Sequence, residues 1–330
     1  MRVLLTGAFG NIGVSTLDEL LRQGHQVRCF DVPTRRNRQT ARHYRKNIEV
    51  FWGDLRNQDA ITRAVQDQQI AIHLAFIIPT LSITGINCEE KPNLAYQVNV
   101  GGTQNLINAL QAMHEPAKMI FSSSLHIYGQ TQDSPPPRIT TDPVHPIEHY
   151  SHHKVKCEAM LRASSLEWLI VRFAAVLPLD LKLDPGMFDV PLNNRIEYVH
   201  TRDVGLALAN AIRCESVWGK TLHIGGGPAC QYYYDEIVQK IMDTVGIGML
   251  PERAFGIVPF CTDWLDTTES QGLLHYQRYT LDDYVRELKT LMGFRRILAR
   301  WFRPFVRASL LRKSPYYHKT NLGAAHGLVG

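Results

Sequence analysis

Short apolar runs alternate with longer amphipathic segments along the first half of the chain. Segments with apolar residues at helical spacing separate the runs of strand type, which cover residues 2–5, 26–31, 48–52, 71–76 and 118–122. The expected helices cover 14–24, 58–66, 98–113 and 150–164. This alternation predicts an α/β fold, a Rossmann-type doubly wound parallel sheet with its site at the carboxyl ends of the strands.

The pattern divides the chain into three parts. We expect a dinucleotide-binding Rossmann core over residues 1–172, with 195–225 returning to the sheet. A small C-terminal substrate-binding region is expected to combine 173–194 and 226–292. A basic amphipathic tail, 293–330, follows.

A glycine-rich loop, Thr6–Gly13, joins the first strand to the first helix. Its glycines allow a tight turn and let the backbone approach a pyrophosphate, which would bind at the helix N-terminus. This strand–loop–helix context indicates a dinucleotide site. Its expected cofactor-binding residues are Gly7, Phe9, Gly10, Asn11, Ile12 and Gly13.

Asp31 ends the second strand, eighteen residues after Gly13, where a carboxylate can accept hydrogen bonds from an adenosine ribose. The basic loop Pro33–Arg38 follows it. Its arginines are either solvated or able to reach a 2′-phosphate, which Asp31 would repel. The expected cofactor is therefore NAD, with NADP as the alternative.

Other strand ends carry further candidates. Asp54 and Leu55 are expected cofactor-binding residues, and Asp54 would either hold the adenine amino group or cap the next helix. The small side chain of Ala75 would let the cofactor pass. The segment 77–96 is long enough to form a substrate lid.

The fifth strand should deliver Ser122 and Ser124 to the cofactor site, and the proline-rich loop beyond it leads to a helix that opens at Tyr150. Tyr150 and Lys154 form the only Tyr-x-x-x-Lys pair in the chain and share one helix face. A nearby ammonium favours the phenolate, so we expect Lys154 to lower the pKa of Tyr150 toward the range of an efficient acid/base. Ser124 would orient the reacting oxygen. Lys154 could also hold the nicotinamide ribose, and both Tyr150 and Lys154 are expected to contact the cofactor.

These motifs resemble the extended short-chain dehydrogenases/reductases, in the NAD-dependent epimerase/dehydratase family. Further matches are His73–Ala75, Val98–Thr103, Phe121–Gly129, Arg195–Val204 and Leu222–Gly227. The resemblance implies a catalytic set of Ser124, Tyr150 and Lys154 and an Asn99 that supports the active-site backbone. It also implies cofactor contacts by Leu74 and Phe173 and a homodimer built on helices 98–113 and 150–164.

The chain departs from the family in its substrate region. Family dehydratases carry Thr-Asp-Glu where this chain has Ser124-Leu125-His126, so a sugar 4,6-dehydratase is not expected. His126 would line the pocket or act as an acid or base. Ala175 replaces an asparagine that touches the diphosphate in the epimerases, and only 177–194 fill a gap that is longer in them. Arg195 matches their diphosphate-binding arginine, or it is a solvated end residue.

Composition limits the partners. The net charge is +5, but residues 293–330 hold eight Lys and Arg and no acid, so the rest of the chain carries −3. That balance gives a nucleic-acid role no electrostatic basis. Six scattered cysteines support neither a disulfide frame nor a zinc site. His149 and His153 are spaced as ligands, but no Cys or carboxylate completes a set, and no metal is expected.

With the first strand starting at residue 2 and no membrane-length apolar run, we expect a cytoplasmic protein. The tail leaves one alternative. Apolar residues and arginines occupy opposite faces over 293–313, which suits peripheral contact with an anionic membrane. The same apolar face could instead cover the protein's own core or pack in a dimer.

The main hypothesis is an NAD(P)-dependent oxidoreductase that interconverts a secondary alcohol and a ketone on a small-molecule substrate. An epimerase, in which the same hydride returns to the opposite face, is the second reading. A cofactor-sensing protein without chemistry is the third, and the intact set of Ser124, Tyr150 and Lys154 argues against it.

Overall fold

The computed structural model describes residues 1–79, 85–179 and 185–317. Its centre is a seven-stranded sheet in the order β3-β2-β1-β4-β5-β6-β8, in which all neighbours are parallel. The strands are β1 (Arg2–Thr6), β2 (Gln26–Asp31), β3 (Ile48–Trp52), β4 (Ile70–His73), β5 (Lys118–Ser124), β6 (Trp168–Phe173) and β8 (Lys220–Ile224). The predicted doubly wound α/β sheet is confirmed.

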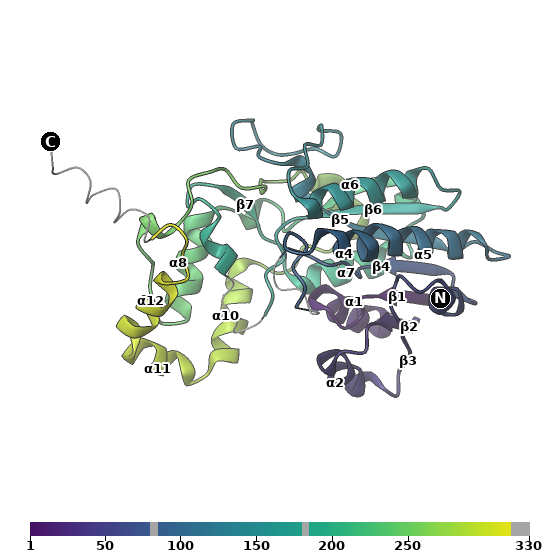
Figure 1. The fold of residues 1–330 in the computed structure, drawn as a ribbon, viewed down its shortest axis with the longest axis horizontal. Coiled ribbons are helices and arrows are strands. Elements are labelled where there is room, and N and C mark those ends of the chain that lie inside the picture. Colours follow the sequence, from purple (N-terminus) through teal and green to yellow (C-terminus); the bar gives the residue numbers. More distant parts are fainter. Residues whose placement is uncertain (80–84, 180–184, 318–330) are drawn as a thin grey trace.

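Helices cover both faces of this sheet (Figure 1). One face packs against α1 (Asn11–Arg22), α7 (Thr201–Ala211) and α9 (Thr268–Leu274), the other against α3 (Gln58–Val65), α5 (Gly102–Gln111) and α6 (His149–Arg162). The helices α1 and α7 approach so closely that a Cβ at Gly205 would lie 2.5 Å from the carbonyl oxygen of Ser15. The two apolar layers hold the helices against the sheet, and the site residues lie at the carboxyl edge of its strands.

A third apolar cluster lies beside the sheet, at the left of Figure 1. It is built from α8 (Tyr234–Thr244), α10 (Leu281–Met292), α11 (Arg295–Trp301) and α12 (Arg303–Leu311), with an antiparallel pair, β7 (Arg195–Glu197) and β9 (Gln231–Tyr233). Short turns of helix complete the described chain: η2 (Leu125–Tyr128), η3 (Pro185–Phe188), η4 (Glu215–Val217), η5 (Pro228–Cys230) and η6 (Glu252–Ala254).

Three segments differ from the sequence prediction. The expected basic loop forms the helix α2 (Arg35–Tyr44), because Thr34 caps its N-terminus by accepting a hydrogen bond from the Asn37 N–H. The expected helix 98–113 begins earlier, as α4 (Pro92–Tyr96) runs through a π-helical turn, η1 (Gln97–Gly101), into α5. Within 195–225, only β8 joins the main sheet, whereas β7 pairs with β9.

The strand ends at the centre of the sheet are tied together by buried polar contacts. His73 Nδ1 lies 2.7 Å from Thr6 Oγ1, and its Nε2 lies 3.0 Å from Thr103 Oγ1. Burial lowers the pKa of His73 to about 3, so this ring is neutral. The order of the strands reverses between β1 and β4, which is where ligands bind in doubly wound sheets.

Candidate active site

The glycine-rich loop between β1 and α1 has no room for side chains at two positions. Gly7 has a φ of +67°, and a Cβ there would lie 2.7 Å from the Ala75 nitrogen. A Cβ at Gly13 would lie 2.1 Å from the Gly7 carbonyl oxygen. Gly10 is the N-cap of α1, so Asn11, Ile12 and Gly13 form its first turn, whose N–H groups have no partner within the helix. This geometry suits a pyrophosphate.

Asp31 holds the loop from the tip of β2. Its carboxylate accepts hydrogen bonds from the backbone N–H groups of Phe9, at 3.0 Å, and Val32, at 2.8 Å, and from the Asn37 amide, at 3.0 Å. Burial raises the pKa of Asp31 to about 6. The side chain is thus positioned where the sequence predicts a ribose contact, and the contact itself stays a prediction.

Phe9 and Asp54 lie farther along the same edge. The Phe9 ring is buried against Trp52, with centroids 5.5 Å apart. Asp54 is paired with Arg56 at 2.6 Å, which lowers the pKa of the carboxyl. It does not cap α3, because Asn57 does so by accepting a hydrogen bond from the Ala60 N–H. Of the two roles expected for Asp54, only the adenine contact remains.

Leu55, Leu74, Ala75, Ser122 and Phe173 also lie at this edge. Leu55 packs on Gly102, where a Cβ would lie 2.5 Å from its own, and the Leu74–Ala75 backbone packs on Gly7. The Ser122 hydroxyl donates to the His73 carbonyl oxygen at 2.9 Å, and Phe173 ends β6 and lines the cavity described below. Their predicted cofactor contacts stay predictions.

Ser124 and Tyr150 meet where β5 ends and α6 begins. Both side chains line the same cavity, and the Ser124 hydroxyl is near enough to the phenol to favour its ionised form, against a larger opposing effect of burial on the pKa of Tyr150. The Tyr150 ring contacts the rings of Phe76 and His126 edge-on, with centroids 5.8 Å and 5.9 Å away. Its backbone N–H donates to Glu89 at 2.9 Å, which fixes the first turn of α6. A hydroxyl pair of this kind can hold a substrate oxygen and exchange a proton with it.

Lys154 lies one helical turn farther along α6 and is buried. Its Nζ donates to the Ser122 carbonyl oxygen at 2.6 Å and lies 3.5 Å from the centre of the Phe76 ring. Burial lowers the pKa of Lys154 to about 7. The expected lowering of the Tyr150 pKa does not occur in this structure: burial raises it, because the phenolate would lose its hydration.

Asn99 lies in the π-helical turn η1, and its side chain is hydrogen-bonded to the backbone that follows β4. It accepts a hydrogen bond from the Ile77 N–H at 2.7 Å and donates to the Ile77 carbonyl oxygen at 2.9 Å. Single π-helical turns within α-helices are frequent at functional sites. The geometry suits the predicted role of Asn99 as a backbone support.

A cavity of about 870 Å³ opens beside Ser124 and Tyr150. His126 lines it, and its Nδ1 lies 2.9 Å from Glu148 Oε2. Glu89 lies on the same wall. Sequence reasoning did not single out Glu148 or Glu89. Glu148 could have been found, because it forms a capping box with Ser151 at the start of α6, whereas Glu89 has no comparable sequence signal.

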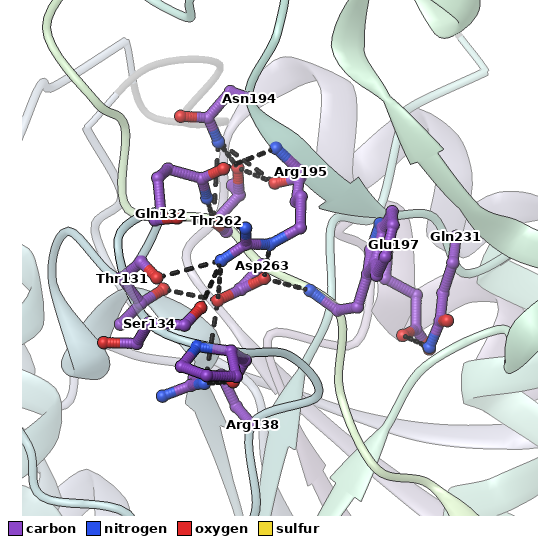
Figure 2. A network of polar contacts seen from close by, with 12 residues as sticks. Thr131, Gln132, Ser134, Arg138, Asn194, Arg195, Glu197, Gln231, Thr262 and Asp263 are labelled. Atoms are coloured by element: carbon purple, nitrogen blue, oxygen red, sulfur yellow. Dashed lines mark hydrogen bonds and ion pairs between the residues drawn. The ribbon is translucent and has the colours of Figure 1, made fainter.

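Arg195 is not among the residues that line the cavity. Figure 2 shows its guanidinium turned into a polar network, where it bonds to both carboxylate oxygens of Asp263, at 2.7 and 3.2 Å. It also donates to the backbone carbonyl oxygens of Thr131, Gln132 and Ser134. With each of its three guanidinium nitrogens hydrogen-bonded, Arg195 joins β7 to two loops. This differs from both expected roles, a diphosphate contact and a solvated end residue.

The described residues hold neither a cluster of metal-ligating side chains nor a membrane-spanning helix. Within 1–79, 85–179 and 185–317, no three His, Cys, Asp or Glu side chains gather as a metal site would require. No helix in the same ranges is long and apolar enough to cross a bilayer. Residues 80–84 of the expected lid segment 77–96 lie outside the described residues.

The first half of the chain matches a known protein family. Residues 3–178 match the model of the NAD dependent epimerase/dehydratase family. The chain belongs to this family. Among solved structures, a short-chain dehydrogenase/reductase superfamily protein from Agrobacterium tumefaciens with bound NAD shares 19% identity and a TM-score of 0.72, covering 92% of this chain and 100% of that one. UDP-glucose 4-epimerase from Bifidobacterium longum, in complex with NAD⁺ and UDP, shares 20% and a TM-score of 0.73, covering 88% and 98%.

Curated relatives whose names give different activities match parts of this chain. UDP-glucose 4-epimerase of Pisum sativum is 28% identical over 221 residues, which are 62% of this chain and 61% of that protein. A 3 beta-hydroxysteroid dehydrogenase/Delta 5-->4-isomerase of Mycobacterium tuberculosis is 36% identical over 110 residues, 33% of this chain and 28% of that protein. The chain thus spans less than two thirds of the length of these relatives.

Proposed function

We propose that this protein is an NAD(P)-dependent oxidoreductase that interconverts a secondary alcohol and a ketone. The pairing of Ser124 and Tyr150 on the wall of one cavity, at the carboxyl edge of the sheet, carries the proposal. A dinucleotide bound there would supply or accept the hydride. The Gly7–Gly13 loop and Asp31 fit such a cofactor, since they offer a side-chain-free approach and a fixed carboxylate.

The chain's own residues handle the proton. Because burial raises its pKa, Tyr150 is a phenol at neutral pH and can donate its proton to the oxygen of a ketone as that oxygen gains negative charge. Ser124 orients the same oxygen. Lys154, held by the Ser122 carbonyl oxygen, lies behind the pair and adds a positive charge there when it is protonated, with a pKa of about 7. In the oxidative direction, each proton moves back along the same path.

An NAD-dependent epimerase with an internal redox cycle is the second candidate. It uses the same three side chains, and several relatives are named as epimerases. The two functions differ in whether the cofactor leaves. An epimerase keeps its dinucleotide through the cycle, whereas a dehydrogenase exchanges it at each turnover.

Substitution of Tyr150 by Phe tests the proposal. We expect turnover of a panel of secondary alcohols and ketones to fall by about 10²–10⁴-fold, because the proton donor is lost. Dinucleotide binding, followed by fluorescence titration, should remain. Tyr96→Phe is the matched control, since Tyr96 is exposed and lies outside the cavity. A Tyr150→Phe enzyme as active as this control would contradict the proposal.

The C-terminal helices support a membrane contact as well. Phe294, Trp301 and Phe305 are 70%, 78% and 75% exposed, although apolar side chains on α11 and α12 also pack inward. The exposed basic side chains around them are Arg295, Arg300, Arg303, Arg312 and Lys313. Exposed aromatic residues among cations suit the surface of an anionic bilayer. We propose that α11 and α12 bind such a surface peripherally.

The assembly state stays a prediction. The family resemblance implies a homodimer through α5 and α6, and the cytoplasmic location remains an expectation from the sequence. Sedimentation equilibrium of the purified protein would test the dimer.

A further inference from the structure

We propose that the substrate is a largely apolar, uncharged alcohol or ketone, a lipid-like molecule rather than a nucleotide sugar. This deepens the proposed function and rests on it. The cavity beside Ser124 and Tyr150 carries the inference, because its two ends differ in chemistry.

The end at the catalytic hydroxyls is polar. Three carboxylates line the cavity there and along its wall, those of Glu89, Glu148 and Asp189. Among the described lining residues, none is Lys or Arg. A diphosphate would enter with two or more negative charges and meet three carboxylates with no Lys or Arg in the described lining, a repulsive arrangement at close range. Arg195, which could have neutralised it, is already bound to Asp263.

The other end of the cavity is a hydrocarbon surface. It runs beneath the helices of the small region and is lined by Ile241 and Met242 of α8, Leu288 and Met292 of α10, Ala299 of α11 and Val306 of α12. Burying apolar surface there is worth roughly 25 cal/mol per Å², whereas a nucleotide or sugar would lose water without gaining hydrogen bonds. At about 870 Å³ the cavity lies within the size range of small-molecule sites.

The two ends together define the ligand. A hydroxyl or keto group at Ser124 and Tyr150 would sit at the head of a body of methylene or ring carbons reaching toward α11 and α12. The same two helices carry the exposed aromatic side chains of the proposed membrane surface. The apolar end of the cavity therefore lies beneath the helices that would rest on lipid.

Displacement of a neutral fluorescent probe, N-phenyl-1-naphthylamine, tests the ligand class without requiring turnover. We expect the probe to bind the full-length protein, and 2-dodecanol to displace it while UDP-glucose does not. Ala299→Trp would fill the apolar end and weaken probe binding about tenfold or more. Ala308→Trp, on the exposed side of α12 and outside the cavity, is the matched control and should bind as the unmodified protein does.

Each outcome decides one proposal. No probe binding, equal binding by both Trp variants, or displacement by UDP-glucose would overturn the apolar ligand class, even if dinucleotide-dependent turnover is found. Probe binding that is lost only in Ala299→Trp supports the class, even if Tyr150→Phe leaves turnover unchanged and the proposed function fails. Circular dichroism of both variants checks that they fold.

Discussion

The Nζ atom of Lys154 lies 3.5 Å from the centre of the Phe76 ring. An aromatic face attracts a cation, but ring and helix also remove the ammonium from water. Burial prevails in this balance and lowers the pKa of Lys154 to about 7 from its ordinary value of 10.5. The protonated, charged form of Lys154 therefore destabilises the folded state.

This cost predicts a pH-dependent stability. Between pH 7 and 10.5 the unfolded chain binds the lysine proton and the folded chain releases it, so the free energy of unfolding should rise with pH across that window. Lys154→Met should remove this rise and be more stable than the unmodified protein below pH 7. Urea unfolding at several pH values measures it. The exposed Lys156→Met is the control and should keep the rise. An unchanged slope in Lys154→Met would refute the prediction.

Asp31 predicts the choice between the two dinucleotides. Asp31→Asn keeps an oxygen that can accept from the Phe9 N–H but removes the negative charge. We expect NADH to bind about tenfold more weakly, because an ionic hydrogen bond to the ribose is lost. NADPH should gain relative to NADH, since its 2′-phosphate no longer meets a carboxylate. Fluorescence titration with both cofactors gives the ratio. A ratio that stays constant would show that Asp31 does not contact the ribose.

Arg195 predicts a loss of stability rather than of substrate affinity. Asp263 is 1% exposed and pairs with both Arg195 and Arg138. Arg195→Ala leaves Arg138 to neutralise it, so we expect the free energy of unfolding to fall by about 3 kcal/mol, the lower end for a broken buried pair. Arg202→Ala removes an exposed pair with Glu287 and should change it by less than about 1 kcal/mol. If Arg195→Ala instead kept full stability and raised KM sharply, Arg195 would be a substrate ligand.

The C-terminal helices predict binding to anionic vesicles. The full-length protein should co-sediment with vesicles that contain phosphatidylglycerol and not with pure phosphatidylcholine, and salt should weaken the binding. Trp301→Ser together with Phe305→Ser should reduce it about tenfold or more, because both side chains are largely exposed. Tyr233→Ser, an exposed aromatic change outside these helices, is the control. Equal binding to both kinds of vesicle, or to neither, would contradict the membrane contact.

Local patterns were sufficient for the sheet and for most of the catalytic edge. The strands β2 and β3 have the predicted limits, because the residues that follow their apolar runs favour turns. Helix α2 was missed because its residues are polar and its start depends on the Thr34 cap. The pairing of β7 with β9 depends on a contact more than thirty residues away, which no local pattern specifies.

The site divides in the same way. Ser124 and Tyr150 meet as their strand and helix predict, but the partner of Arg195 lies 68 residues away at Asp263. The raised pKa of Tyr150 comes from burial by distant segments, whereas the sequence suggested only the helical neighbour Lys154. Nor did the sequence reveal that the cavity runs beneath four helices of the small region. Tertiary contacts therefore determine the substrate side more than the cofactor side.

The dinucleotide content of the purified protein tests the central claim most directly. Denaturation, chromatography and absorbance would identify any released cofactor, and titration with NADH and NADPH would follow if none is found. We expect one dinucleotide per chain, either already bound, as in an epimerase, or bound reversibly, as in a dehydrogenase. A protein that neither releases nor binds a dinucleotide would contradict the proposed enzyme.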